Sequence, residues 1–138
     1  MMQACLTPRE EDTVLLSEIL QALVSLVRSG IDATAANRHN WRLLDIEVLE
    51  RMADIRRLLE VTPPIKRSCE AVIWNCLEFT HAAVLAEDGE VTISPALTNA
   101  RINAMSALAD LTLAVEKARP SKLALSLQYI APPEPAPS

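Results

Sequence analysis

The segment from Thr7 to Gly30 constrains the fold more than any other part of the chain. Thr7 and Glu10 have the spacing of a capping box, and Pro8 lies between them at the first helical position, so a helix is predicted to start here. Gly30 predicts its end, because glycine adopts the left-handed conformation after a helix without steric cost. Apolar residues cover roughly 260° of its circumference, more than a helix on one core requires. We therefore expect this helix to be either central to the fold or half-buried against a second chain.

Three more helices are predicted, near residues 41–60, 64–86 and 95–118. Asn40 is the expected N-cap of the first, while Thr62-Pro63 and Ser94-Pro95 combine an N-cap with a proline at the first helical position. Each helix has an apolar stripe with helical spacing. The stripe of 41–60 is Trp41, Leu44, Val48, Met52, Ile55 and Leu59, widened by Ile46, Leu49 and Ala53, and that of 64–86 is Ile65, Cys69, Val72, Cys76, Phe79 and Ala83.

The C-terminal part of the chain has a different pattern. After Pro120, apolar residues alternate with small or polar ones from Leu123 to Tyr129, and this period of two predicts a short strand. Its one partner within the chain would be an extended piece at Glu90–Ile93. Residues 131–138 are rich in proline and form a tail. The prediction is an all-α, four-helix bundle-like single domain over residues 1–130, with a short extended C-terminal segment and a proline-rich tail.

Composition narrows the classes of function. A chain of 138 residues fits one domain, and two glycines leave little material for a glycine-rich phosphate loop. The net charge of −5 works against non-specific binding of nucleic acid. Three cysteines without framework spacing indicate buried thiols in a reducing compartment. The sequence has no signal peptide pattern and its longest apolar run, with Glu18 inside it, is short for a membrane span, so we expect a cytoplasmic protein without membrane contact.

Few residues indicate chemistry. Glu78 and His81 form one Glu-x-x-His element, whereas di-iron bundles use two, and His39 has no glutamate at the matching place. Nucleophilic catalysis needs a nucleophile, a base and an orienting group, and the two histidines lie in no recognisable motif of that kind. We therefore expect no enzyme activity, no metal and no cofactor.

Five cations lie around the link between the second and third helices. They are Arg51, Arg56, Arg57, Lys66 and Arg67. This basic corner offers an alternative function, a dimeric DNA-binding transcriptional regulator of the helix-turn-helix type. Neighbouring carboxylates and the negative net charge make nucleic acid the less favoured partner.

Apolar surface in excess of one core is the strongest functional indication. We expect a partner interface on two sets of residues, one on the third helix and one in the predicted strand. These residues are Trp74, Leu77, His81 and Leu85, and Leu123, Leu125, Leu127 and Tyr129. The sequence thus predicts a small, non-catalytic intracellular protein-binding module that binds another protein or itself, with a homodimer expected. An adaptor or a steric inhibitor fits this description, and small acidic inhibitors of this kind are often encoded by mobile genetic elements.

Overall fold

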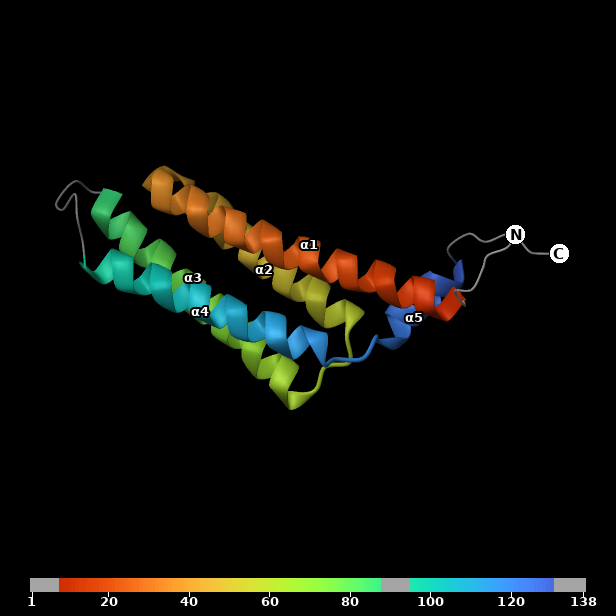
Figure 1. The fold of residues 1–138 in the computed structure, drawn as a ribbon. Helices are drawn as coiled ribbons and strands as arrows, with labels where there is room; N and C mark the ends of the chain where they lie inside the picture. The colour runs from red at the N-terminus through yellow and green to blue at the C-terminus, as the bar shows by residue number, and fades with distance from the viewer. Residues whose placement is uncertain (1–7, 88–94, 131–138) are drawn as a thin grey trace.

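The computed structural model describes the backbone of residues 8–87 and 95–130, and side chains over 15–86 and 95–127. Its elements in order are α1 (Pro8–Ala36), η1 (Arg38–Asn40), α2 (Trp41–Leu58), α3 (Pro63–Glu87), α4 (Pro95–Glu116) and α5 (Lys122–Ile130). The four long helices lie side by side in an elongated bundle, and α5 lies at the end where α1 begins (Figure 1). The prediction of an all-α, bundle-like single domain is therefore confirmed.

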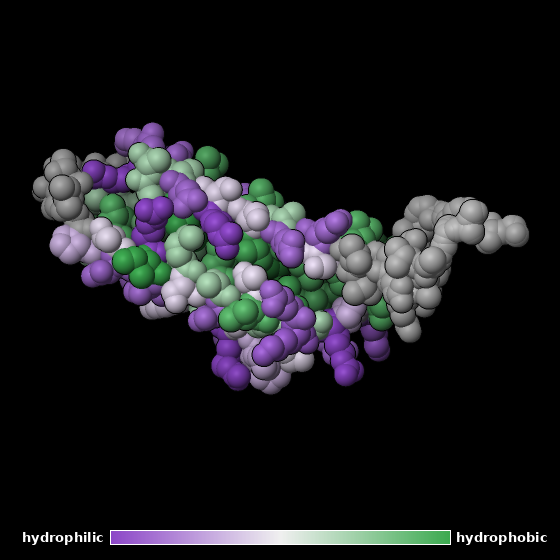
Figure 2. All heavy atoms as spheres, in the orientation of Figure 1, coloured by the Kyte–Doolittle hydropathy of each residue, from purple (hydrophilic) through white to green (hydrophobic). Residues whose placement is uncertain are grey.

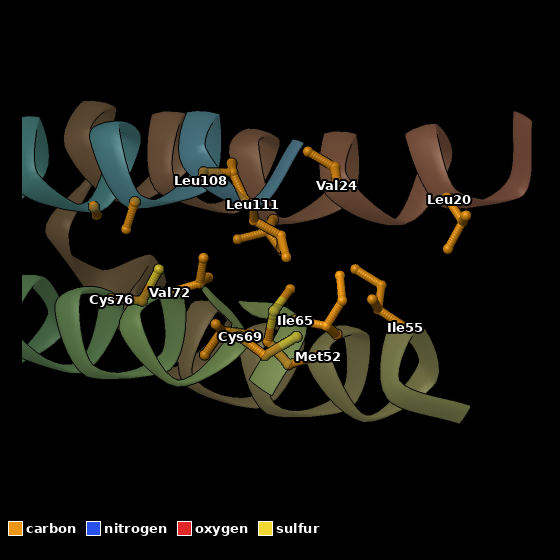
Figure 3. Close-up of a cluster of buried hydrophobic side chains, with 14 of the residues drawn as sticks. Leu20, Val24, Met52, Ile55, Ile65, Cys69, Val72, Cys76, Leu108 and Leu111 are labelled. Atoms are coloured by element: carbon orange, nitrogen blue, oxygen red, sulfur yellow. The ribbon is translucent and has the colours of Figure 1, made fainter. Parts of the chain in front are cut away.

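The core lies between two layers of helices. Figure 3 shows side chains of α1 and α4, such as Val24 and Leu111, pointing toward those of α2 and α3, such as Met52 and Cys69. The predicted stripes of α2 and α3 are buried from Leu44 to Leu59 and from Ile65 to Ala83. Since the buried residues are mainly Leu, Val, Ile, Ala and Cys, the core is aliphatic, as the composition predicts.

Proline marks the helix starts as predicted. α3 begins at Pro63, where the backbone N–H of Lys66 donates to the carbonyl oxygen of Thr62 over 2.9 Å, and α4 begins at Pro95. Three predicted features lie outside the described residues: the capping box at Thr7, the extended piece at 90–93 and the proline-rich tail. The division of the chain at residue 130 accordingly stays a prediction.

The predicted end of α1 at Gly30 is wrong, because the helix continues to Ala36. Gly30 lies inside the helix where α1 meets α2, and a Cβ at this position would lie 3.0 Å from Cδ1 of Leu44. The absence of a side chain therefore serves close helix packing here rather than a left-handed turn.

The prediction that Asn40 caps α2 is also wrong. The Asn40 side chain makes no capping bond and instead donates from Nδ2 to the carbonyl oxygen of Ala33 over 3.0 Å. Asn37 accepts from the backbone N–H of His39 and caps the short 3-10 helix η1. The chain thus reverses direction between α1 and α2 through η1.

The predicted strand at Leu123–Tyr129 is a helix, α5. Oγ of Ser121 accepts from the backbone N–H of Ala124 over 3.1 Å, which is an N-cap, and Leu and Ala are strong helix formers. The extended pairing at this point is limited to one antiparallel bridge between Leu59 and Pro120 in the described part of the chain. A lone strand leaves its backbone groups unpaired, whereas a helix satisfies them within itself.

Candidate protein-binding surfaces

The outer side of α3 holds one half of the predicted partner interface. Trp74 is 64% exposed and Leu85 is 56% exposed, while His81 is exposed and Leu77 is half-buried. Their spacing of three, four and four residues puts them along one side of the helix. This side faces away from the buried stripe that contains Cys76, so the structure brings these four predicted residues together.

Helix α2 adds two aliphatic side chains, Ile46 and Leu49, beside these residues of α3. Oγ1 of Thr80 donates to Oδ1 of Asp45 over 2.7 Å, which sets the antiparallel register between α2 and α3. Leu49 lies one turn after Asp45, and Leu77 lies one turn before Thr80, so Leu49 and Leu77 are at the same level of the bundle. Leu49 and its neighbour Ile46 are exposed.

We call this combined surface the Trp74 face. It consists of Trp74, Leu77, His81 and Leu85 of α3 with Ile46 and Leu49 of α2. The prediction that Ile46, Leu49 and Ala53 widen the buried stripe of α2 is wrong, because all three are exposed and the core uses only the narrower stripe that contains Val48. The position of Ile46 and Leu49 beside Trp74 depends on the α2–α3 register, which their own spacing in the sequence does not reveal.

The edges of the Trp74 face carry charges of both signs. Arg42 and Arg56 on α2 and Glu70 and Glu78 on α3 are exposed. An apolar centre with a polar, charged rim is the usual composition of a protein–protein interface. The face can therefore give a partner both apolar contact and charge-dependent orientation.

The other predicted interface residues lie on α5. Leu123, Leu125 and Leu127 are exposed, and the side chain of Tyr129 is outside the described side chains. Because this segment is helical, Leu123 and Leu127 share one side while Leu125 points elsewhere. Because α5 is a helix, this segment has no sheet edge, and the prediction of strand pairing between chains through it is wrong.

Carboxylates occupy part of the basic corner. The guanidinium group of Arg51 lies 3.0 Å from Glu47, 3.3 Å from Glu50 and 3.1 Å from Asp54, and Arg57 also pairs with Asp54. The other three residues of the basic corner, Arg56, Lys66 and Arg67, are exposed. α2 and α3 run antiparallel along one another (Figure 1), whereas helix-turn-helix motifs cross at about 90–120°. The DNA-binding alternative stays a prediction, and a DNA titration at several salt concentrations would test it.

A groove of about 460 Å³ runs between α1 and α4. Hydrophobic side chains form its floor (Figure 2), among them Leu20 and Val24 of α1. The charged groups on its rim are Arg28 and Glu116. Asp32 and Arg101 form an ion pair 3.1 Å long, which sets the register between α1 and α4. In this register Arg28 and Glu116 lie roughly 16 Å apart along the helices. These two groups are too far apart to act as a catalytic pair.

The two thiols on α3 are buried, form no disulfide and are unreactive near neutral pH. Burial raises the pKa of Cys69 to about 11, with a smaller opposing effect from Arg56, and raises the pKa of Cys76 to about 12. Both thiols are therefore protonated near neutral pH, and the thiolate is the nucleophilic form. In the part of the chain whose side chains are described, no three His, Cys, Asp or Glu residues come together as ligands for a metal ion.

One helix has the length and composition of a membrane span. It covers Leu15–Ala36, with a mean hydropathy of 1.2. One such helix is weak evidence, because an apolar helix in the core of a water-soluble bundle has the same properties.

Comparison of the chain with protein-family models, with curated proteins and with solved structures finds no match.

Proposed function

We propose that this protein is a non-catalytic protein-binding module that binds another protein through the Trp74 face, as an adaptor or a steric inhibitor. The observation that carries the proposal is the exposure of Trp74, 64% on a regular helix with Leu85, Leu49 and Ile46 also exposed nearby. Tryptophan is enriched among the residues that dominate binding energy at protein interfaces. Covering these side chains would remove apolar surface from water and favour the complex.

The shape and charge of the face indicate the kind of partner. The indole of Trp74 is 64% exposed on the outer side of α3, so the partner needs an apolar depression that accepts it. The charges around the depression should oppose Arg42 and Arg56 of α2 and Glu70 and Glu78 of α3. A folded protein surface meets these requirements better than nucleic acid, which would be repelled by the two glutamates.

The buried thiols support a non-catalytic role in the cytoplasm. Their raised pKa values keep both thiols protonated near neutral pH, so they contribute to core packing rather than to nucleophilic attack. Unpaired cysteines are typical of proteins in a reducing compartment.

Affinity isolation from the native host with three baits tests the proposal. The baits are the wild-type protein, Trp74→Glu and a control, Leu113→Glu. Leu113 is 59% exposed on α4 and lies outside the Trp74 face. We expect a stoichiometric partner with the wild-type and control baits, and its loss with Trp74→Glu.

Purified partner then allows a titration. Trp74→Ala should weaken the complex by about 2–4 kcal/mol, or roughly 30- to 1,000-fold, as expected for a central aromatic residue. Trp41→Phe leaves Trp74 as the only tryptophan, so its fluorescence should shift to shorter wavelength on binding. A partner that binds Trp74→Glu as tightly as the wild type would refute the proposal.

A further inference from the structure

Helix α1 has a second apolar stripe that the bundle does not use. Its residues follow one another at spacings of four, three, four, three and four. They are Leu15, Ile19, Ala22, Leu26, Ser29 and Ala33, and we call them the outer seam. Leu15 is 51% exposed, Ile19 40% and Leu26 45%, and the three small residues are exposed as well. An alternation of threes and fours is the heptad spacing by which one helix packs along another.

The outer seam is free of charge over roughly 27 Å of helix. The core-facing stripe of α1, which includes Leu20, Val27 and Ile31, is already covered by α2 and α4. Of the charged residues on α1, Asp32 is paired with Arg101 on the side of α4. The chain has a net charge of −5, so two copies repel each other least where such an uncharged stripe faces its counterpart.

The order of large and small residues along the outer seam identifies a second copy as its occupant. When two copies of α1 are set antiparallel with residue numbers that add to 48, Leu15 faces Ala33 of the second copy. In the same register Ile19 faces Ser29, and Leu26 faces Ala22. Every large side chain then lies opposite a small one, which is how facing layers interdigitate without voids. A parallel pair would set Ser29 against Ser29 and Ala33 against Ala33, leaving that half poorly packed.

We propose that the protein forms an antiparallel homodimer in which the outer seams of two α1 helices pack against each other around a two-fold axis that passes between Ala22 and Leu26. The sequence-based prediction of a homodimer placed its contact on the side of α3 that holds Trp74 and Leu85 or on the Leu123–Tyr129 segment, whereas this proposal places it on α1. The Trp74 face remains open for a different protein, so the dimer presents two such faces.

The dimer should be weak. One pair of helices buries less than the roughly 1,200–2,000 Å² of a stable interface. Dissociation in the micromolar range follows, so the dimer is visible only when the concentration is varied.

Sedimentation equilibrium of the full chain from about 1 to about 100 μM tests the proposal. We expect the wild-type protein to shift from monomer to dimer across this range. Ala22→Glu should give monomer throughout, because it places a charge against Leu26 of the second copy, while glutamate remains a good helix former. Leu26→Gln, which changes shape little and adds no charge, should weaken the dimer at least tenfold. Gln21→Glu adds the same charge at an exposed position off the outer seam and should leave the dimer intact.

Disulfide trapping tests the orientation. In a background with Cys5→Ser, a mixture of Leu15→Cys and Ala33→Cys proteins should give the mixed disulfide between positions 15 and 33 as its main product under mild oxidation. A parallel pair would give mainly the link from position 15 to position 15. Native Cys69 and Cys76 are buried and should not compete.

Besides a disulfide mainly between two copies of position 15, three results would overturn the proposal. They are a monomer at every concentration, a dimer unchanged by Ala22→Glu, and a monomer that binds phosphatidylcholine–phosphatidylglycerol vesicles through α1. The last result would assign the outer seam to lipid instead of a second copy. Trp74→Glu should leave the dimer intact, so failure of this proposal and failure of the proposed function are separate outcomes.

Discussion

At the residue scale, Cys69 and Cys76 show how burial controls reactivity. Both side chains are fully buried on the core side of α3, where water cannot stabilise a thiolate. Desolvation is the main cause of each raised pKa, and nearby Asp45 adds to the effect at Cys76. The prediction from sequence that both thiols are buried is confirmed.

These pKa values predict how stability depends on pH. The thiol pKa is 9.0 for an unperturbed cysteine and about 11 and about 12 in the folded protein. Above pH 9 the unfolded chain releases protons that the folded chain keeps, so the free energy of unfolding falls as pH rises toward 11–12. Each thiol contributes at most about 1.4 kcal/mol per pH unit. Urea denaturation between pH 7 and pH 11 measures this decline.

A matched variant isolates the contribution of the thiols. Cys69→Ala with Cys76→Ala removes both groups, so its stability should decline less steeply above pH 9, although the smaller side chains lower its stability at every pH. An equal slope in the variant and the wild type would contradict the assignment. In a Cys5→Ser background, native protein at pH 8 should also resist labelling by a thiol reagent until denaturant is added.

At the scale of elements, Ser121 connects α5 to α2. Its Oγ caps α5 by accepting from Ala124, and it donates to the carbonyl oxygen of Arg57 over 2.5 Å. Its backbone N–H donates to the carbonyl oxygen of Leu58 over 2.9 Å. One residue therefore begins a helix and attaches it to the bundle.

Ser121→Ala is expected to loosen α5. Loss of an N-cap costs about 0.5–2 kcal/mol, and a nine-residue helix has little stability of its own. Helicity of residues 122–130, measured by NMR chemical shifts, should fall while α1 to α4 stay folded. Ser126→Ala is the control, since Ser126 is exposed within the same helix and alanine is the better helix former there. Equal helicity of α5 in the two variants would show that the cap does not support it.

At the scale of the whole molecule, the bundle is packed more tightly at one end than at the other. On α1, Val27 and Ile31 are 0% exposed, whereas Leu16 is 7% exposed and Leu20 and Val24 line the groove beside α4. The helices are thus in close contact near Gly30, and the groove lies between α1 and α4 toward the start of α1.

This gradient predicts unequal costs for cavity-forming substitutions. Ile31→Ala should lower the free energy of unfolding by about 3–4 kcal/mol, because a fully enclosed site keeps its cavity. Leu16→Ala should cost only about 1–2 kcal/mol, because water can enter the groove. Urea denaturation gives both values, and amide hydrogen exchange should be faster over residues 16–24 than over 27–36. Equal costs would mean that the groove closes in solution.

Much of the architecture was predictable from sequence because the signals are local. An apolar stripe at helical spacing requires no knowledge of its neighbours, and the stripes of α2 and α3 are buried from Leu44 and Ile65 onward as predicted. Proline at the first helical position likewise depends only on its own missing N–H, and α3 and α4 begin at Pro63 and Pro95. The exposed side of α3 around Trp74 followed from the same periodicity.

The remaining features depend on contacts between segments that are distant in the chain. Whether Gly30 ends α1 or lies within it depends on how closely Leu44 approaches. Whether Leu123–Leu127 is strand or helix depends on Ser121, which caps α5 and bonds to α2. The sequence by itself determined that α1 has more apolar surface than one core requires. The tertiary structure decided that α2 and α4 cover the Leu20–Ile31 side and leave Leu15, Ile19 and Leu26 in solvent, because only the packing of the other helices selects which side of an apolar helix is buried.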